Sequence, residues 1–446
     1  MAFEINRPIK VDREAPGSGE LGEVRYSLLH PRVTPVERCL LWTSMVVLPL
    51  QHTIPTVAGM SFSFLLFAIL FAYIIVNRLR TLGEILCQPV FIAAYAFIGV
   101  ALLLEFSSTL PRYQEVIRFT QMIGGAVCVA VLCRDRSGLT AGLYGYIGTA
   151  LWVAIVLYFT SYGMLQGMGP TRDFHEASNL RGEVEVGMKA NLNGLAFICA
   201  QGAIVAFALS LSDRFKHFRV ILLGVGAFCL VAAFLPMSRG AAVISAVSIA
   251  TILHVYGVKQ GKALIFACIL GLSLYVVVPE AVWSRMAFST EVREGGKMEG
   301  RAYIYTTALN RLPEYFMSGV GAGNFFGPWG FEKGFFRAEG TKVLGAHNTI
   351  LQITLFWGVL GLSMFLWMLW LIYRLIPSRC GRDALSLALL GIIISLGLML
   401  LESHQFWDKW FSFGMGMLIG ARRWIWPTGL VSAIEVTQSS WNEKIK

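Results

Sequence analysis

Long apolar runs separated by short polar connections dominate the pattern of this chain. An apolar run of about 17–25 residues is long enough to cross a lipid bilayer as a helix. We count about twelve such runs, so the pattern predicts an all-α, polytopic membrane protein with about 12 transmembrane helices. The predicted spans lie near residues 38–56, 60–77, 87–104, 115–133, 139–160, 190–211, 218–236, 240–257, 262–279, 347–375, 384–401 and 404–421.

The composition agrees with a membrane protein, because 56% of the residues are hydrophobic and only 14% are charged. A soluble globular domain has about 25% charged residues. The net charge of +10 does not indicate nucleic-acid binding, because the cations are scattered between apolar runs instead of gathering on one face. No secretory signal pattern precedes the first apolar run, so we expect that run to remain in the membrane as a span.

Lysine and arginine concentrate in every second connection between the predicted spans, as in Arg78 with Arg80 and Arg134 with Arg136. This bias predicts that both tails lie in the cytoplasm and that the two long polar segments lie outside. The second long segment is rich in aromatic residues and has a helical pattern, so we expect it to be ordered. The predicted division is a tail at 1–37, nine spans at 38–279 with an outside loop at 161–189, an outside loop domain at 280–346, three spans at 347–421, and a tail at 422–446.

Polar side chains on one face of the fourth predicted span are candidates for a binding site. Gln114, Arg118 and Gln121 lie at positions i, i+4 and i+7, so a helix places them on the same face. Charged groups are costly in lipid, which favours a face that looks into a cavity. The alternative is that Arg118 is an ordinary helix-end arginine that extends toward water.

Two further arginines are predicted near the outer membrane surface. Arg239 follows a tight turn between two spans, where its planar group suits phosphate oxygens, although it is also suited to anchoring lipid headgroups. Arg301 is followed by Tyr305, Ala308 and Leu312 at the spacing of an amphipathic helix. An arginine on such a stripe needs an acidic partner or a bound anion.

His347 and Asn348 open the tenth predicted span. A histidine near the start of a helix feels the positive end of the helix dipole, which favours the neutral imidazole that a general base requires. Asn348 and Gln352 lie four residues apart and form a polar patch beside it. The alternative for His347 is an ordinary residue at the membrane boundary.

Other common kinds of site are poorly supported. The glycine-rich residues 319–323 lack the Lys-Ser/Thr ending of a phosphate loop, so a flexible turn is expected there. The eight cysteines contain no C-x-x-C pattern and are expected to be small apolar residues. We expect no metal and no cofactor, because the outside acids are scattered along the chain. These acids are Asp173, Glu280, Glu402 and Asp408.

Outside arginines and one neutral histidine suit transfer from an activated donor whose leaving group is a phosphate. Several motifs occur together in this order: RG at 181–182 with Asn193, MSRG at 237–240, RAYIY at 301–305, SGVGAGN at 318–324, HNTILQ at 347–352, then Gly358 and Gly361. This set resembles the O-antigen ligase/polymerase superfamily of bacterial envelope glycosyltransferases. The resemblance covers roughly residues 181–361.

The resemblance implies a GT-C-like glycosyltransferase of the bacterial inner membrane, with a large periplasmic loop between spans 9 and 10. It implies an undecaprenyl-diphosphate-linked glycan donor and an inverting, metal-independent transfer at the periplasmic face. Arg239 and Arg301 are then expected to hold the diphosphate, and His347 to activate or position the acceptor hydroxyl. The residues expected to bind substrate are Arg118, Gln121, Arg181, Asn348 and Gln352.

Several acceptors occur within this superfamily. Chain length, the number of predicted spans and the single dominant outside segment favour an O-antigen ligase, which uses lipid A–core as the acceptor. An O-antigen or exopolysaccharide polymerase and a protein O-oligosaccharyltransferase use the same donor and remain open. A transporter of lipid-linked sugars would instead predict charges at mid-membrane depth and a two-half repeat, and neither is visible in the sequence.

Overall fold

The computed structural model describes the chain in segments that contain most of the predicted spans. The described residues are 32–47, 62–161, 192–236, 238–259, 261, 301–335, 345–376, 383–402 and 409–425. Every regular element in these ranges is a helix. The longer helices are α2 (Pro35–Val47), α3 (Phe62–Leu86), α4 (Pro89–Phe106), α5 (Gln114–Leu132), α6 (Arg136–Ser161), α8 (Leu192–Ser210), α9 (Arg219–Phe234), α10 (Arg239–Tyr256), α17 (Thr349–Leu375), α18 (Ala384–Glu402) and α19 (Lys409–Ile425).

Nine helices among the described residues are long and apolar enough to cross a membrane. The prediction of an all-α, multi-pass membrane protein is therefore confirmed for this part of the chain. Two more predicted spans correspond to α2, with 13 described residues, and α19, with 17 residues, which are shorter. The predicted span at 262–279 lies outside the described residues. The total of about 12 spans and the GT-C-like architecture remain predictions.

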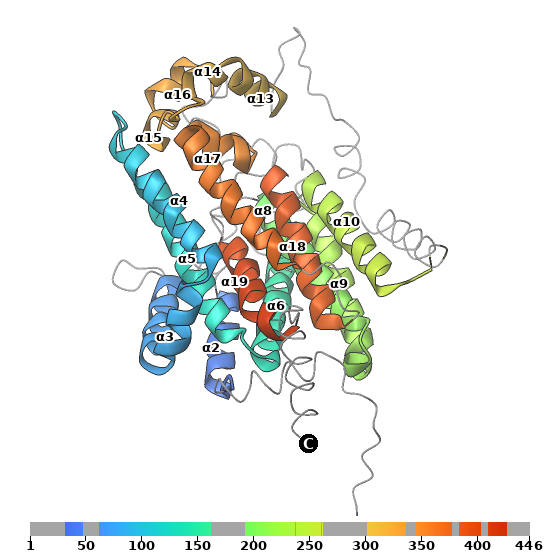
Figure 1. The fold of residues 1–446 in the computed structure, drawn as a ribbon. Coiled ribbons are helices and arrows are strands. Elements are labelled where there is room, and N and C mark those ends of the chain that lie inside the picture. The colour runs from blue at the N-terminus through green and yellow to red at the C-terminus, as the bar shows by residue number, and fades with distance from the viewer. Residues whose placement is uncertain are drawn as a thin grey trace, which may run out of the picture.

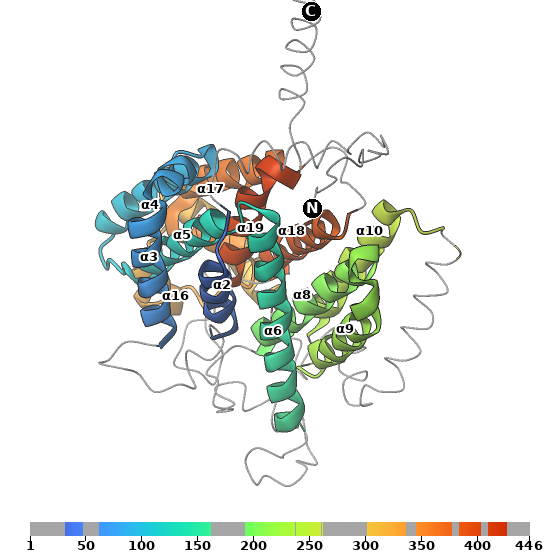
Figure 2. The ribbon, with the colours of Figure 1, turned by 90° about the horizontal axis from the view of Figure 1, so that it is seen from below.

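Helix α8 lies at the centre of one half of the bundle and packs against α6, α9, α10 and α18 (Figure 2). Within its apolar window, 94% of the residues are buried, so this helix faces protein on nearly all sides. Close approach depends on small residues: a Cβ atom on Gly202 would lie 2.0 Å from the Ala150 Cβ of α6. Gln201 is buried and donates to Ser395 of α18 at 3.0 Å.

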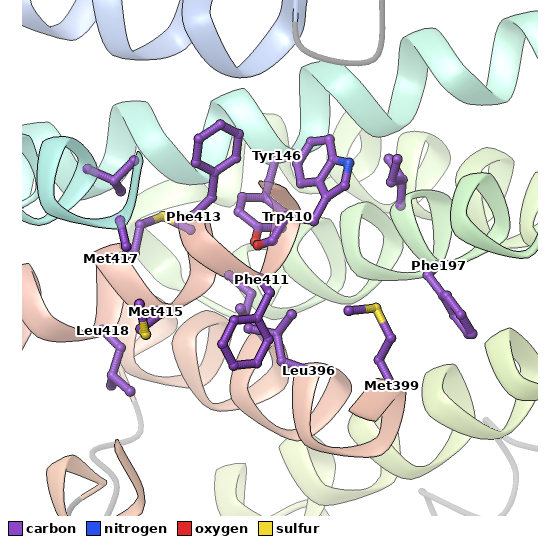
Figure 3. Packing of buried hydrophobic residues seen from close by; sticks show 14 of the residues in the cluster. Tyr146, Phe197, Leu396, Met399, Trp410, Phe411, Phe413, Met415, Met417 and Leu418 are labelled. Atoms are coloured by element: carbon purple, nitrogen blue, oxygen red, sulfur yellow. The ribbon is translucent and has the colours of Figure 1, made fainter. Parts of the chain in front are cut away.

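Glycines also allow α19 to pack closely on α5. Cβ atoms added at Gly416 and Gly420 would each lie 2.5 Å from a backbone oxygen of α5, those of Ala126 and Ala130. Small residues four apart are a common device for close packing of helices in membranes, where packing replaces the hydrophobic effect. At the other end of α19, the Trp410 ring packs on Tyr146 of α6 with ring centres 5.1 Å apart (Figure 3).

Four short helices cap one end of the bundle (Figure 1). They are α13 (Arg301–Asn310), α14 (Leu312–Tyr315), α15 (Ala322–Phe325) and α16 (Pro328–Glu332). We call residues 301–335 the cap. Its core is aromatic: the Phe325 ring lies 5.2 Å from Phe335 and 5.5 Å from Phe356 of α17, measured between ring centres. The expectation of helical order is confirmed for the cap, and its place outside the membrane remains a prediction.

Two side chains show how the cap is stabilised. Tyr315 is buried, and burial raises its pKa to about 12, so its hydroxyl keeps the proton that it donates to the Ala308 carbonyl at 2.8 Å. Ala308 is fully buried, as the amphipathic pattern predicted. Arg311, which lies off that pattern, is exposed and pairs with Glu314 at 3.0 Å, and this hydrogen bond lowers the pKa of Glu314.

The opposite end of the bundle is tied together by ion pairs and hydrogen bonds between connections. Arg78 contacts the buried Glu37 at 2.8 Å, and Arg134 donates to Thr81 at 2.9 Å. The Asp135 carboxylate accepts from the Val33 backbone at 2.7 Å. These residues come from the tail and connections that the charge bias placed together on the cytoplasmic side. The structure confirms that they meet at one end, and the side of the membrane remains a prediction.

Helices α3 and α17 differ from the predicted spans in ways that involve their neighbours. Helix α3 continues nine residues beyond the predicted end at 77, through a non-helical residue at Arg78 (φ −136°, ψ 25°). Arg78 reaches Glu37 of α2 from this position, so a buried ion pair accompanies the kink. Helix α17, predicted as one continuous span at 347–375, is interrupted at Gly358 (φ 61°, ψ −160°). The cap enters this interruption, as described below.

The packing of α19 on α5 leads to a prediction about Gly420. Gly420→Ala places a methyl group where the Ala130 carbonyl lies, so we expect the free energy of unfolding to fall by about 1–3 kcal/mol. Thermal unfolding of the detergent-solubilised protein measures this change. The control is Gly397→Ala in α18, where a Cβ atom has nothing within 4 Å. Equal stability of the Gly420→Ala variant and the wild type would contradict the close packing.

Candidate functional site

The glycine-rich part of the cap forms backbone hydrogen bonds with α17 at its break. We call the three bonds between residues 316–321 and 355–359 the splice. At a helix break within a membrane, the freed backbone groups need new partners. Here the cap supplies them, so this stretch is an ordered insert and the expectation of a flexible turn was wrong. The three backbone bonds are Val320 N to Leu355 O at 2.9 Å, Gly321 N to Phe356 O at 2.9 Å, and Val359 N to Phe316 O at 2.6 Å.

A fully buried carboxylate lies beside this splice. Glu105, at the end of α4, accepts four hydrogen bonds from N–H groups. Two come from the backbone of the cap, Ala322 at 3.0 Å and Gly323 at 3.3 Å. The others come from the Arg112 backbone at 2.7 Å and the Trp357 indole at 3.3 Å. Glu105 therefore joins α4, the α4–α5 turn, the cap and α17 at one point.

The backbone on either side of His347 is fixed by neighbouring side chains. His347 adopts the left-handed conformation, with φ of 51°, which is uncommon for a residue with a side chain. Its carbonyl accepts from the Tyr305 hydroxyl of α13 at 3.2 Å. The preceding amide, of Ala346, donates to the Gln352 side chain at 2.6 Å. Contacts from the cap and from α17 thus set the direction in which the imidazole leaves the chain.

Asn348 and Gln352 both have structural partners. Asn348 is the N-cap of α17, where its side-chain oxygen accepts from the Leu351 amide at 3.0 Å. Gln352 is buried, and its Nε2 atom has no hydrogen-bond partner among the described residues. The Gln352 side-chain amide can therefore donate a hydrogen bond to a further group. Substrate binding by these two residues stays a prediction.

The end of α18 lies between the start of α17 and the start of α10. The Asn348 side chain donates to the Leu401 carbonyl at 3.1 Å. The next residue, Glu402, lies against Gly240, where an added Cβ atom would be 2.8 Å from its carboxylate oxygen. Gly240 follows Arg239, the exposed first residue of α10. Residues more than 100 positions apart in the sequence therefore gather at one end of the bundle.

Glu402 was not predicted as a site residue, because the sequence shows it only as one of several scattered acids. Its significance depends on the contact with Gly240, and no spacing within the sequence reports that contact. The available signal was its position at the outer end of an apolar run, where a charged residue is costly. Glu402 is half-buried at the end of α18, which contacts the starts of both α10 and α17.

The polar face predicted on α5 lies on the surface of the described protein. Gln114, Arg118 and Gln121 are all exposed, and Arg118 pairs with the buried Glu115 of the same helix at 3.0 Å. The described residues therefore do not enclose this face in a cavity. Binding of substrate by Arg118 and Gln121 stays a prediction.

The remaining predicted residues are only partly described. Helix α13 begins at Arg301, one turn before Tyr305, but the Arg301 side chain lies outside the described residues. Arg181 also lies outside them. In the described part of the chain, no three His, Cys, Asp or Glu side chains come together in an arrangement that holds a metal ion.

A comparison with known families identifies this region. Residues 224–366 match the model of the family described as O-antigen ligase. This part of the chain is therefore similar to the O-antigen ligase superfamily. The match confirms the resemblance seen in the motifs, and it extends from α9 to the middle of α17. It includes Arg239, Arg301 and His347 and leaves Glu105 and Arg118 outside. No curated protein matches the chain.

The segment that matches the family contains the helix break at Gly358, which leads to a prediction. Its positive φ strains any residue with a side chain, and an added Cβ atom would lie 2.4 Å from the Met317 carbonyl. We expect Gly358→Ala to lower the free energy of unfolding by at least about 2 kcal/mol. Thermal unfolding tests this, with Gly99→Ala in the open middle of α4 as the control. A wild-type unfolding temperature for Gly358→Ala would show that the break tolerates a side chain.

Proposed function

We propose that this protein is an O-antigen ligase. It transfers a glycan polymer from undecaprenyl diphosphate to a sugar hydroxyl of lipid A–core at the periplasmic face of the bacterial inner membrane. One observation carries the proposal: within the segment that matches the family, the starts of α10 and α17 both contact the end of α18. These two helix starts carry Arg239 and His347.

The donor is held by its diphosphate in this proposal. Arg239 is the first residue of α10, where the positive end of the helix dipole adds to the charge of the guanidinium group. Arg301 occupies the corresponding first position of α13. An arginine fork makes paired hydrogen bonds with phosphate oxygens, and these strengthen as negative charge develops on the leaving group.

His347 acts on the acceptor in this proposal. The imidazole takes the proton from the acceptor hydroxyl while the hydroxyl oxygen attacks the anomeric carbon of the donor sugar. The bond between that carbon and the diphosphate oxygen breaks, and undecaprenyl diphosphate leaves with the bonding electron pair. Attack opposite the leaving group inverts the anomeric centre. The fixed backbone around His347 suits a group that must be held in one direction.

The orientation follows the charge bias of the connections, with both termini in the cytoplasm and the cap in the periplasm. Lipid A–core is the proposed acceptor because the chain has one dominant outside segment and the length of a ligase. Membrane lipids surround the apolar surface of the bundle. The same chemistry serves a polymerase or a protein O-oligosaccharyltransferase, which differ only in the acceptor.

Two substitutions separate the proposed roles of the candidate residues. In purified full-length protein, His347→Ala should lower kcat by about 10²–10⁴-fold because the general base is lost. Arg239→Ala should raise the KM for the lipid-linked donor by about 10–100-fold because a charge-assisted contact to phosphate is lost. Both constants come from transfer assays with lipid-diphosphate-linked glycan and lipid A–core.

The control is Arg311→Ala, because Arg311 is an exposed arginine of the cap that pairs with Glu314. It should keep kcat and KM within about twofold of the wild type. Near-normal kcat in the His347→Ala variant would rule out the general base. An unchanged donor KM in the Arg239→Ala variant would rule out its contact with the diphosphate.

A further inference from the structure

Glu105 lies outside the segment that matches the family and more than 100 residues before Arg239, Arg301 and His347. Burying a carboxylate is costly unless hydrogen bonds replace the lost water. Here N–H groups from three separate parts of the chain do so: the α4–α5 turn, the cap and α17. The cost of the buried charge is therefore offset only when all three parts are in place.

The position of the Glu105 side chain requires a hydrogen-bond acceptor and excludes a hydrogen-bond donor. A carboxylate accepts at both oxygens, whereas a glutamine amide of the same size places an NH₂ group where one oxygen stood. Each Glu105 oxygen faces two N–H groups: Oε1 faces Arg112 and Gly323, and Oε2 faces Ala322 and Trp357. Either orientation of a glutamine would set its NH₂ group against two donors.

The bonds of Glu105 continue directly into the splice. Gly321 adopts φ of 79°, and a Cβ atom there would lie 2.4 Å from the Ser108 hydroxyl in the α4–α5 turn, so this position needs glycine. The Gly321 amide donates to the Phe356 carbonyl of α17, and the next amide, of Ala322, donates to Glu105. One short stretch of backbone thus joins the carboxylate to the broken helix.

The break makes the first third of α17, residues 349–357, a separate rod of about 12–14 Å. Its start is tied to α18 through Asn348 and Leu401. Its end is tied to Glu105 through the Trp357 indole and to the cap through the splice. His347 lies immediately before Asn348, so a tilt of this rod moves the histidine relative to Arg239.

We propose that Glu105 is a positioning residue for the transfer reaction: its carboxylate fixes residues 349–357 of α17 and thereby the place of His347. This inference rests on the function proposed above for His347. Glu105 need not contact substrate or take part in proton transfer. A displacement of about 1 Å at a reacting group lowers a rate by about 100-fold, so loosening this support should lower kcat.

The test compares variants of the full-length protein. Glu105→Gln should lower kcat by about 100-fold with the donor KM within about threefold, because the arginines are untouched. Glu105→Asp should recover part of kcat, because it keeps an acceptor-only group. Trp357→Phe removes one hydrogen-bond donor to Glu105 and keeps an aromatic ring, so it should lower kcat by about tenfold.

Two control substitutions match these changes. Glu314→Gln makes the same change at an exposed glutamate of the cap, and Trp410→Phe removes the same atoms from a buried tryptophan in α19. Both should keep kcat within about threefold. Hydrogen–deuterium exchange of residues 319–323 and 345–352 should accelerate in Glu105→Gln and Trp357→Phe and remain at the wild-type rate in both controls.

Wild-type kcat in both Glu105→Gln and Trp357→Phe, or unchanged exchange at 345–352 in both, would overturn the inference. A raised donor KM with unchanged kcat would also overturn it, because Glu105 would then act on donor binding. If Glu105→Gln does not fold, Trp357→Phe decides by the same criteria. If the wild type itself transfers no glycan, the proposed function fails, and the exchange measurement still shows whether Glu105 fixes the His347 segment.

Discussion

The buried carboxylate of Glu105 sets the geometry of the capped end of the bundle. A charge removed from water is tolerated only where hydrogen bonds replace its hydration, and here N–H groups from the α4–α5 turn, the cap and α17 provide them. The glycine-rich loop must therefore approach α4 closely, which explains the glycine at Gly321 beside Ser108. Cap and bundle are joined by this shared constraint in addition to aromatic packing, such as that of Phe325 on Phe356.

The break in α17 depends on the same close approach of the cap to the bundle. A broken helix leaves backbone groups without partners, which lipid cannot supply. The cap supplies them, so the loop and the break stabilise each other. The result is a short, firmly held helical segment, residues 349–357, that presents His347 at the end of the bundle. The helices before residue 224 lie outside the family match, yet they supply the support through Glu105.

Much of the helical framework followed from the sequence, and much of the site did not. Helices α5, α9 and α18 begin and end within two residues of the predicted limits, because apolar length fixes a span directly. The buried Ala308 followed from helical periodicity in the same way. Glu105, by contrast, reads as one acid at the end of an apolar run. Its partners Ala322 and Trp357 lie 217 and 252 residues away, so no local pattern reports them.

The break at Gly358 and the contact of Glu402 with Gly240 could not be predicted from the sequence for the same reason. Glycine is frequent in membrane helices, and it is the positive φ of Gly358 and the nearby Met317 carbonyl that show why a side chain is excluded there. Glu402 acquires meaning from Gly240, which is distant in sequence. Arg239 and His347 could be proposed from the sequence because Arg239 begins a helix and His347 lies just before one, and sequence patterns do record helix starts.

The most direct test of the proposed ligase is a gel analysis of glycans in cells that lack this protein. The lipid A–core fraction and the lipid-diphosphate fraction are compared with those of the parent cells. Our account predicts long glycan polymer retained on the lipid diphosphate, together with lipid A–core that carries no polymer. Lipid A–core capped by a single repeat unit would contradict a ligase and identify a polymerase instead.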